Sequence, residues 1–128
     1  MPARNHSHDA SVVILDFGGQ YAQLIARRVR ENHVHSVIVP PDVTVEQLRE
    51  HNTIGLIFSG SPVSVYAQNA PRCRPEVLHS GWPILGICYG LQLACDMLGC
   101  EVKAGASREF GRTPLEVVDQ DVLLANVP

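Results

Sequence analysis

The sequence predicts an α/β protein with an open, mainly parallel sheet and helices on both faces, incomplete at its carboxyl end. Two observations support this prediction. Short apolar runs at 11–17, 54–58 and 83–87 are typical of strands buried on both faces. Segments with apolar residues at helical spacing separate these runs. Such an alternation implies right-handed crossovers and ligands at the carboxyl ends of the strands.

The expected elements follow one another in a regular order, each with its own local signal. Thr44 is a candidate cap for the second helix, and Gly99 is a natural C-cap for the last one. After Cys100 the alternation breaks down, and only short strands are expected, at 101–103 and 115–118. The main strands are expected at 11–17, 36–39, 54–58 and 83–87, and the helices at about 21–32, 45–50, 75–79 and 91–98.

Composition narrows the class of protein. The 128 residues are 45% hydrophobic and 18% charged, with a net charge of -3, which is ordinary for a globular protein and gives no footprint for nucleic acid or anionic lipid. No apolar run is long enough for a membrane span, and the polar start lacks a secretory signal, so we expect a cytoplasmic protein. The four cysteines lack CxxC spacing, and no metal site is expected.

Cys88 is the candidate catalytic nucleophile. It stands in the pattern Gly86-x-Cys88-x-Gly90, where small neighbours allow a tight, strained turn between a strand and a helix. The positive end of the following helix would favour the thiolate over the thiol. The alternative interpretation is a small buried core residue, which most free cysteines are.

Two segments near Cys88 extend the predicted site. Gln92 lies one helical turn further on and would hydrogen-bond a substrate beside the thiol. The loop at 60–62 leaves the third strand at the same edge of the sheet, so its backbone N–H groups would bind a developing oxyanion, with the Tyr89 N–H as a second donor. An ordinary β-turn is the alternative for this loop.

The predicted site lacks a base. A cysteine nucleophile usually relies on a histidine, but none follows Cys88 in the sequence. Four histidines precede predicted strands and so belong at the amino edge of the sheet, a strand length of ~17 Å from the thiol. Two more lie in the polar tail. The six are His6, His8, His33, His35, His51 and His79.

Five segments, at 14–21, 24–30, 59–66, 85–92 and 108–111, together resemble one family. The likeness runs from about Val12 to Val118 and points to the amidotransferase domain of the glutamine-hydrolysing GMP synthetases, a branch of the class I glutamine amidotransferases. It implies a flavodoxin-like sheet, with a flexible tail at 1–10 and with 11–128 as the N-terminal portion of such a domain.

The resemblance also implies roles for residues. Cys88 would attack the side-chain amide of L-glutamine, release ammonia and leave a glutamyl thioester that water resolves. Backbone N–H groups of Ser61 and Tyr89 would form the oxyanion hole, and Gly60 and Gln92 would help to hold glutamine. Ser61 stands where the family commonly has glycine. Because the donor is a backbone N–H, a serine is tolerated there if its φ is negative or if its strain is supported.

In this family the ammonia passes to a separate ATP pyrophosphatase domain of the same full-length chain. That domain uses ATP and Mg²⁺ to convert XMP to GMP in purine biosynthesis, and the full-length protein is a homodimer. The resemblance implies that the portion present here binds no cofactor. Because the family's His-x-Glu lies further downstream, we expect this portion to be inactive alone. Two other functions stay open: a non-catalytic binding or regulatory module of the same fold, and an amidotransferase of another pathway.

Overall fold

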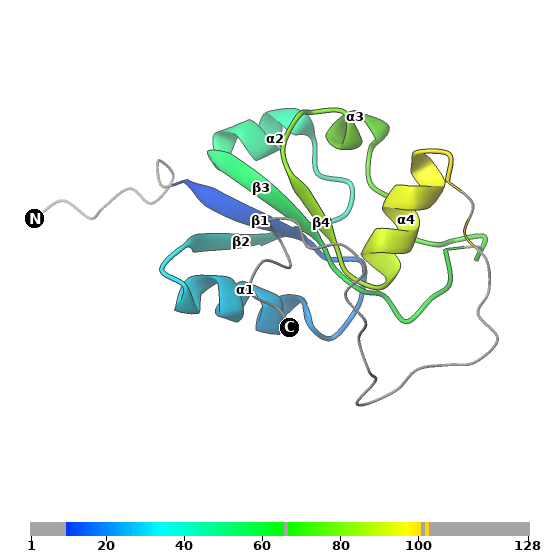
Figure 1. The fold of residues 1–128 in the computed structure, drawn as a ribbon, viewed down its shortest axis with the longest axis horizontal. Coiled ribbons are helices and arrows are strands. Elements are labelled where there is room, and N and C mark those ends of the chain that lie inside the picture. The colour runs from blue at the N-terminus through cyan, green and yellow to red at the C-terminus, as the bar shows by residue number, and fades with distance from the viewer. Residues whose placement is uncertain (1–9, 66, 101, 103–128) are drawn as a thin grey trace, which may run out of the picture.

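Four parallel strands form the centre of the structure, a computed structural model that describes residues 10–65, 67–100 and 102. They lie in the order β2-β1-β3-β4, so that β1 has a neighbour on each side (Figure 1). This arrangement confirms the predicted α/β fold with a parallel sheet. The strands are β1 (Ser11–Leu15), β2 (His35–Val39), β3 (Thr53–Phe58) and β4 (Ile84–Gly86).

Helices cover both faces of this sheet, as the alternation of strands and helices predicts. Helix α1 lies on one face, and α2, α3 and α4 lie on the other (Figure 1). The helices are α1 (Ala22–Glu31), α2 (Val45–Glu50), α3 (Pro75–Leu78) and α4 (Tyr89–Met97).

Two apolar cores hold the layers together. Successive residues of a strand point to opposite faces of the sheet. Val13 and Leu15 of β1 therefore pack in the larger core, beneath α2, α3 and α4. Ile14, which lies between them, packs against Ala22 and Ala26 of α1 on the other face. Burial on both faces explains why β1 is apolar at nearly every position.

Helix α2 begins with the cap that the sequence predicts. The Thr44 hydroxyl accepts a hydrogen bond from the Gln47 N–H at 3.1 Å. In return, the Gln47 side chain accepts one from the Thr44 N–H at 3.0 Å. This capping box satisfies two N–H groups that the start of a helix otherwise leaves without partners.

Two strands are shorter than the sequence predicts. β1 ends at Leu15 rather than at residue 17, because the Asp16 carboxylate accepts a hydrogen bond from the Gly18 N–H at 2.8 Å and turns the chain. β4 covers three residues rather than 83–87, because the chain already turns at Cys88 toward the helix. Both strands thus end where loops gather at the carboxyl edge of the sheet.

Some predictions lie outside the described residues. These are the flexible tail at 1–10, apart from residue 10, and the short strands at 101–103 and 115–118, apart from Val102. The limits of the domain therefore stay predictions. Within the described part of the chain, no helix is long and apolar enough to cross a membrane.

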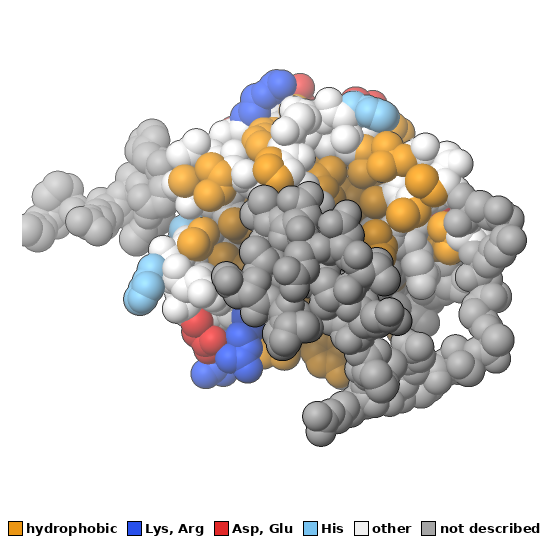
Figure 2. All heavy atoms as spheres, viewed as in Figure 1, with side chains coloured by type: hydrophobic (Ala, Val, Ile, Leu, Met, Phe, Trp, Pro, Cys, Tyr) orange, Lys and Arg blue, Asp and Glu red, His pale blue; other side chains and the backbone are white. Residues whose placement is uncertain are grey.

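Strand β4 is an outer strand of the sheet formed by the described residues. Large apolar side chains are exposed on β4, on α4 and at the C-cap of α4, namely Leu85, Leu91 and Leu98. Figure 2 shows apolar side chains gathered over this side of the molecule.

Helix α4 packs against β3 and β4 with its backbone. A Cβ atom at Gly90 would overlap the carbonyl group of Phe58, at the end of β3. At Gly86, a Cβ atom would lie 2.6 Å from the Cα atom of Leu91. Because neither position has room for a side chain, these two glycines allow the helix to start directly against the sheet.

We expect Gly90→Ala to lower the free energy of unfolding by at least ~2 kcal/mol, because the added methyl group displaces α4 from the rigid backbone of β3. Urea unfolding followed by circular dichroism measures this change. Gly55→Ala is the matched control, since a Cβ atom there would meet only the Pro83 carbonyl oxygen, at an ordinary 3.8 Å. Equal stability of the two variants would contradict this view of the α4 contact.

Candidate active site

The turn between β4 and α4 carries Cys88 in a strained conformation. Its φ is 52° and its ψ is -114°, a combination that residues with a side chain rarely adopt. The residue is exposed, and it is the N-cap of α4. The structure therefore has the sharp strand-to-helix turn that the pattern of glycines predicts, and it does not bury Cys88 in the core.

Backbone N–H groups at the start of α4 lie next to this cysteine. Tyr89 is the first helical residue, so its N–H has no partner within the helix. The Gln92 N–H donates to the Cys88 carbonyl at 3.1 Å, which closes the first turn. The Gln92 side chain is exposed on the same end of the helix as the thiol.

The loop that follows β3 reaches the same turn. A Cβ atom built on Gly60 would lie 3.8 Å from the Cβ atom of Cys88, so the backbone at Gly60 passes directly beside the cysteine. The φ of Ser61 is not positive, so a serine is accommodated at this position without left-handed backbone strain. The structure thus brings the predicted loop and the predicted nucleophile together at one edge of the sheet.

Two residues that the sequence analysis did not single out hold this loop in place. A Cβ atom at Gly19 would lie 2.5 Å from the Gly60 carbonyl oxygen, so the loop after β1 packs backbone to backbone on the loop after β3. The buried Ser59 hydroxyl donates to the Leu15 carbonyl at 2.7 Å and accepts from the Phe17 N–H at 3.3 Å. The glycine pair at 18–19 was the only sequence signal for this close packing of the two loops.

Three aromatic rings lie beneath the site. The ring centroid of Phe17 is 5.6 Å from that of Phe58 and 5.6 Å from that of Tyr89. All three residues are almost fully buried. Tyr89 also donates its hydroxyl to the Pro71 carbonyl at 2.5 Å, and burial raises the pKa of this phenol. The residue after Cys88 is therefore anchored by its side chain.

The later part of the β3 loop is fastened to α4 by charge. Arg72 forms an ion pair with Asp96 at 3.0 Å and donates to the Val65 carbonyl at 3.4 Å. Both side chains of the pair are partly exposed, so we expect it to contribute no more than ~1 kcal/mol. Its role is geometric, because it ties the loop that carries Gly60 to the helix that follows Cys88.

The described histidines lie at the other edge of the sheet. His35 begins β2 and stands opposite Ser11, the first residue of β1. His51 caps the end of α2 just before β3, and His79 caps the end of α3 before β4. His33 precedes β2. No histidine in the described part of the chain therefore stands beside Cys88.

The described residues offer few other sites. They contain no group of three or more His, Cys, Asp or Glu side chains placed to hold a metal ion. A groove of about 560 Å³ lies between α2 and α3, with Arg49, Arg74 and His79 among its lining residues. None of the predicted site residues lines this groove.

These features are those that the sequence predicts for a cysteine nucleophile. An exposed thiol at a strained turn has a free helix N–H on one side and a glycine loop on the other. Such a thiol can attack a carbonyl carbon while neighbouring N–H groups hold the oxygen that becomes negative. The arrangement is typical of enzymes that form a thioester on cysteine.

The chain belongs to the class I glutamine amidotransferases. The model of that family, glutamine amidotransferase class-I, matches residues 13–127.

Within this family, the chain is similar to GMP synthases. It is 49% identical over 118 residues to the glutamine-hydrolysing GMP synthase of Prochlorococcus marinus, a match that covers 91% of this chain and 22% of that protein. It is 48% identical over 107 residues to that of Caldanaerobacter subterraneus, covering 84% and 21%. The chain thus spans about a fifth of the length of these relatives.

A solved structure shows the same fold. The crystal structure of a GMP synthase subunit protein from Thermoplasma acidophilum matches with a TM-score of 0.76 at 28% sequence identity. The match covers 96% of this chain and 62% of that one. The predicted relationship to the amidotransferase domain of GMP synthases is therefore confirmed, whereas the roles of individual residues stay predictions.

Replacing Cys88 by glycine should raise the free energy of unfolding by about 1 kcal/mol, because glycine adopts the observed φ of 52° without strain. Cys95→Gly in the interior of α4 is the matched control and should lower it by ~1 kcal/mol. Chemical denaturation of both variants measures the changes. A loss of stability in Cys88→Gly would show that the turn is not strained.

Cys73 packs beneath the loop, and its burial raises the pKa of its thiol to about 11. Because the folded state favours the neutral thiol, this contribution to stability is complete below the ordinary value of 9.0 and is lost as the pH rises toward 11. The difference in unfolding free energy between the wild type and Cys73→Ala should therefore shrink over this range. Denaturation at a series of pH values measures it, and a constant difference would contradict the assignment.

Proposed function

We propose that this chain is the glutamine-binding part of a GMP synthase, and that Cys88 is the nucleophile that takes ammonia from glutamine. The observation that supports this most directly is the exposed, strained turn at Cys88, with the Gly60 loop at its side. Membership of the class I glutamine amidotransferases supplies the substrate class. The similarity to GMP synthases supports the proposed pathway.

The reaction proceeds in two steps. The Cys88 sulfur attacks the amide carbon of the glutamine side chain, and the amide oxygen becomes an oxyanion that the N–H groups of Ser61 and Tyr89 hold. The carbon–nitrogen bond then breaks, the nitrogen takes up a proton, and ammonia leaves. Water attacks the resulting glutamyl thioester, so that glutamate and the free thiol are released. Gly60 and the exposed Gln92 side chain hold the substrate in position.

A base must take the thiol proton and return it to the leaving nitrogen. Among the described residues no histidine lies at this edge of the sheet, and no residue after Cys88 is a histidine. The chain alone therefore hydrolyses glutamine slowly or not at all. This arrangement also keeps a second candidate function open, a binding or regulatory module that keeps the fold without turnover.

The ammonia serves a second active site. An ATP pyrophosphatase domain of the same full-length protein uses it, with ATP and Mg²⁺, to convert XMP to GMP in the cytoplasm, and the full-length protein is a homodimer. The chain spans about a fifth of the GMP synthases that it matches, which leaves ample length in those proteins for such a domain.

A glutamine analogue that carries a chloroketone in place of the amide tests this proposal. It should alkylate Cys88 at least ~10-fold faster than a chloroketone without the amino-acid end, because binding orients it beside the thiol. Mass spectrometry of the digested protein measures the modified cysteine over time. L-Glutamine should slow the labelling, and D-glutamine should not.

Two variants control the experiment. Cys88→Ser should abolish the labelling, whereas Cys95→Ser, which removes a thiol from the same helix, should leave it unchanged. Equal labelling rates with both chloroketones would contradict the proposed glutamine pocket beside Cys88. Turnover of L-glutamine by this chain at ~1 per second or faster would instead contradict the proposal that the chain alone lacks the base for catalysis.

A further inference from the structure

The end of helix α4 carries two cysteines outside the predicted active site. Helix α4 closes with two backbone hydrogen bonds, from the Cys100 N–H to the Cys95 carbonyl at 2.8 Å and from the Gly99 N–H to the Asp96 carbonyl at 3.2 Å. Gly99 has a φ of 87°. Numbered from Cys95 as residue 1, these are a bond from residue 6 to residue 1 and a bond from residue 5 to residue 2. Together with a glycine in the left-handed conformation they form a Schellman motif.

This motif brings its first and last residues together. The motif folds the chain back on the helix. The side chain of the residue after the glycine therefore commonly packs on the side chain of the third residue from the helix end. Here those two positions are Cys100 and Cys95. With ordinary bond lengths, their 2.8 Å hydrogen bond limits the distance between the two Cα atoms to at most ~6.7 Å. A disulfide spans Cα atoms ~4.4 to 6.8 Å apart.

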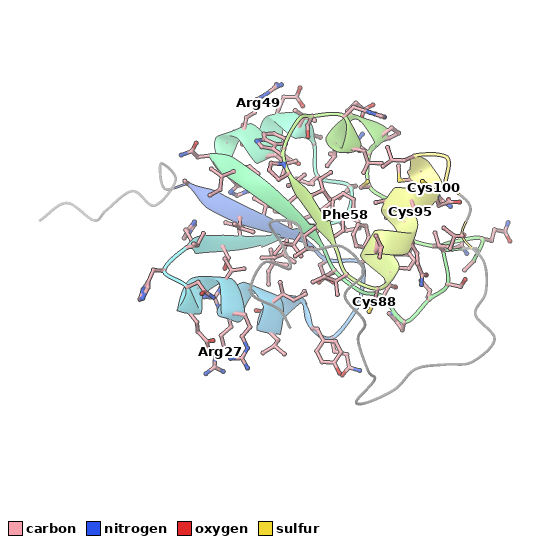
Figure 3. The ribbon with its side chains drawn as sticks, viewed as in Figure 1. Arg27, Arg49, Phe58, Cys88, Cys95 and Cys100 are labelled. Carbon is pink, nitrogen blue, oxygen red and sulfur yellow. The ribbon has the colours of Figure 1, made fainter. Side chains whose placement is uncertain are left out.

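Both thiols can be reached from solvent. Cys100 is exposed and Cys95 is partly buried. Figure 3 labels both at the end of α4 that lies away from Cys88. When a small reagent modifies one thiol of this cap, a second thiol therefore lies nearby, at a backbone separation that a disulfide can span.

The other two cysteines are poor competitors. Cys73 is buried with its sulfur 3.7 Å from that of Met97, and burial raises the pKa of its thiol to about 11, so it carries little reactive thiolate at neutral pH. Cys88 precedes Cys95 by seven residues, a rise of ~10 Å along the helix axis, which is beyond the span of a disulfide.

We infer that Cys95 and Cys100 form a dithiol site, which low-molecular-weight disulfides such as oxidised glutathione convert to an intramolecular disulfide. One thiolate attacks a sulfur of the small disulfide, forms a mixed disulfide and expels one small thiol. The second protein thiolate then attacks the protein sulfur and expels the other. The protein loses two electrons and two protons, and the small disulfide gains them as two thiols.

Closing this disulfide covalently fixes the cap of the helix whose other end carries Cys88. The last turn of α4 also contains Asp96, which holds the β3 loop through Arg72. Oxidation therefore restrains the anchor of that loop, whereas reduction leaves it held by hydrogen bonds and one ion pair. The site is independent of the glutaminase proposal, because neither thiol touches the turn at Cys88.

The test uses the reduced 128-residue protein, equilibrated with reduced and oxidised glutathione at fixed ratios. Free thiols are then alkylated, and proteases that cut after Glu76 and Glu101 and before Asp96 separate Cys95 from Cys100. We expect a cross-linked pair of peptides, 77–95 with 96–101. Cys95→Ser and Cys100→Ser should each abolish it, and Cys88→Ser, which removes the other thiol of peptide 77–95, should retain it.

A second variant tests the role of the cap. Gly99→Ala opposes the left-handed conformation and should lower the equilibrium constant for the disulfide ~10-fold against glutathione. Gly81→Ala, at a glycine of similar φ (91°) outside the cap, should leave it unchanged. A cross-link that survives in Cys95→Ser, a stable mixed disulfide without a cross-link, or equal constants in the two glycine variants would overturn the inference.

Discussion

The close approach of helix α4 to the end of strand β3 is the constraint on which the rest of this structure depends. Gly90 lies against the Phe58 carbonyl and Gly86 against the backbone of Leu91, so neither position can carry a side chain. The helix therefore starts directly at the sheet, which forces Cys88 into its strained turn. A helix held further out would carry the thiol away from the Gly60 loop.

Parallel pairing explains both what this edge contains and what it lacks. In a parallel sheet every strand ends at the same edge, so the loops after β1, β3 and β4 meet there and can build one site. Residues that precede strands, such as His35 and His51, are sent to the opposite edge by the same rule. The base that the proposed reaction at Cys88 requires therefore has to come from an element that approaches the carboxyl edge, and not from these histidines.

Four cysteines within a short stretch of chain have different surroundings, and local geometry separates their chemistry. Cys73 lies in the core, where burial disfavours its charged form. Cys88 is exposed at a turn that the helix start and the Gly60 loop enclose. Cys95 and Cys100 share a helix cap. The flanking glycines single out Cys88 in the sequence, but no spacing there separates Cys73, Cys95 and Cys100, because the reactivity of a thiol depends on exposure, partners and backbone geometry.

The order of strands and helices, the cap at Thr44, the helix end at Gly99 and the sharp turn at Cys88 were all readable from the sequence, because each depends on periodicity or turn chemistry within a few residues. The packing of Gly19 on Gly60 was not, nor was the bridge that Ser59 makes between β1 and β3. These depend on atoms from segments ~40 residues apart, which no local pattern records and only the folded sheet brings within contact.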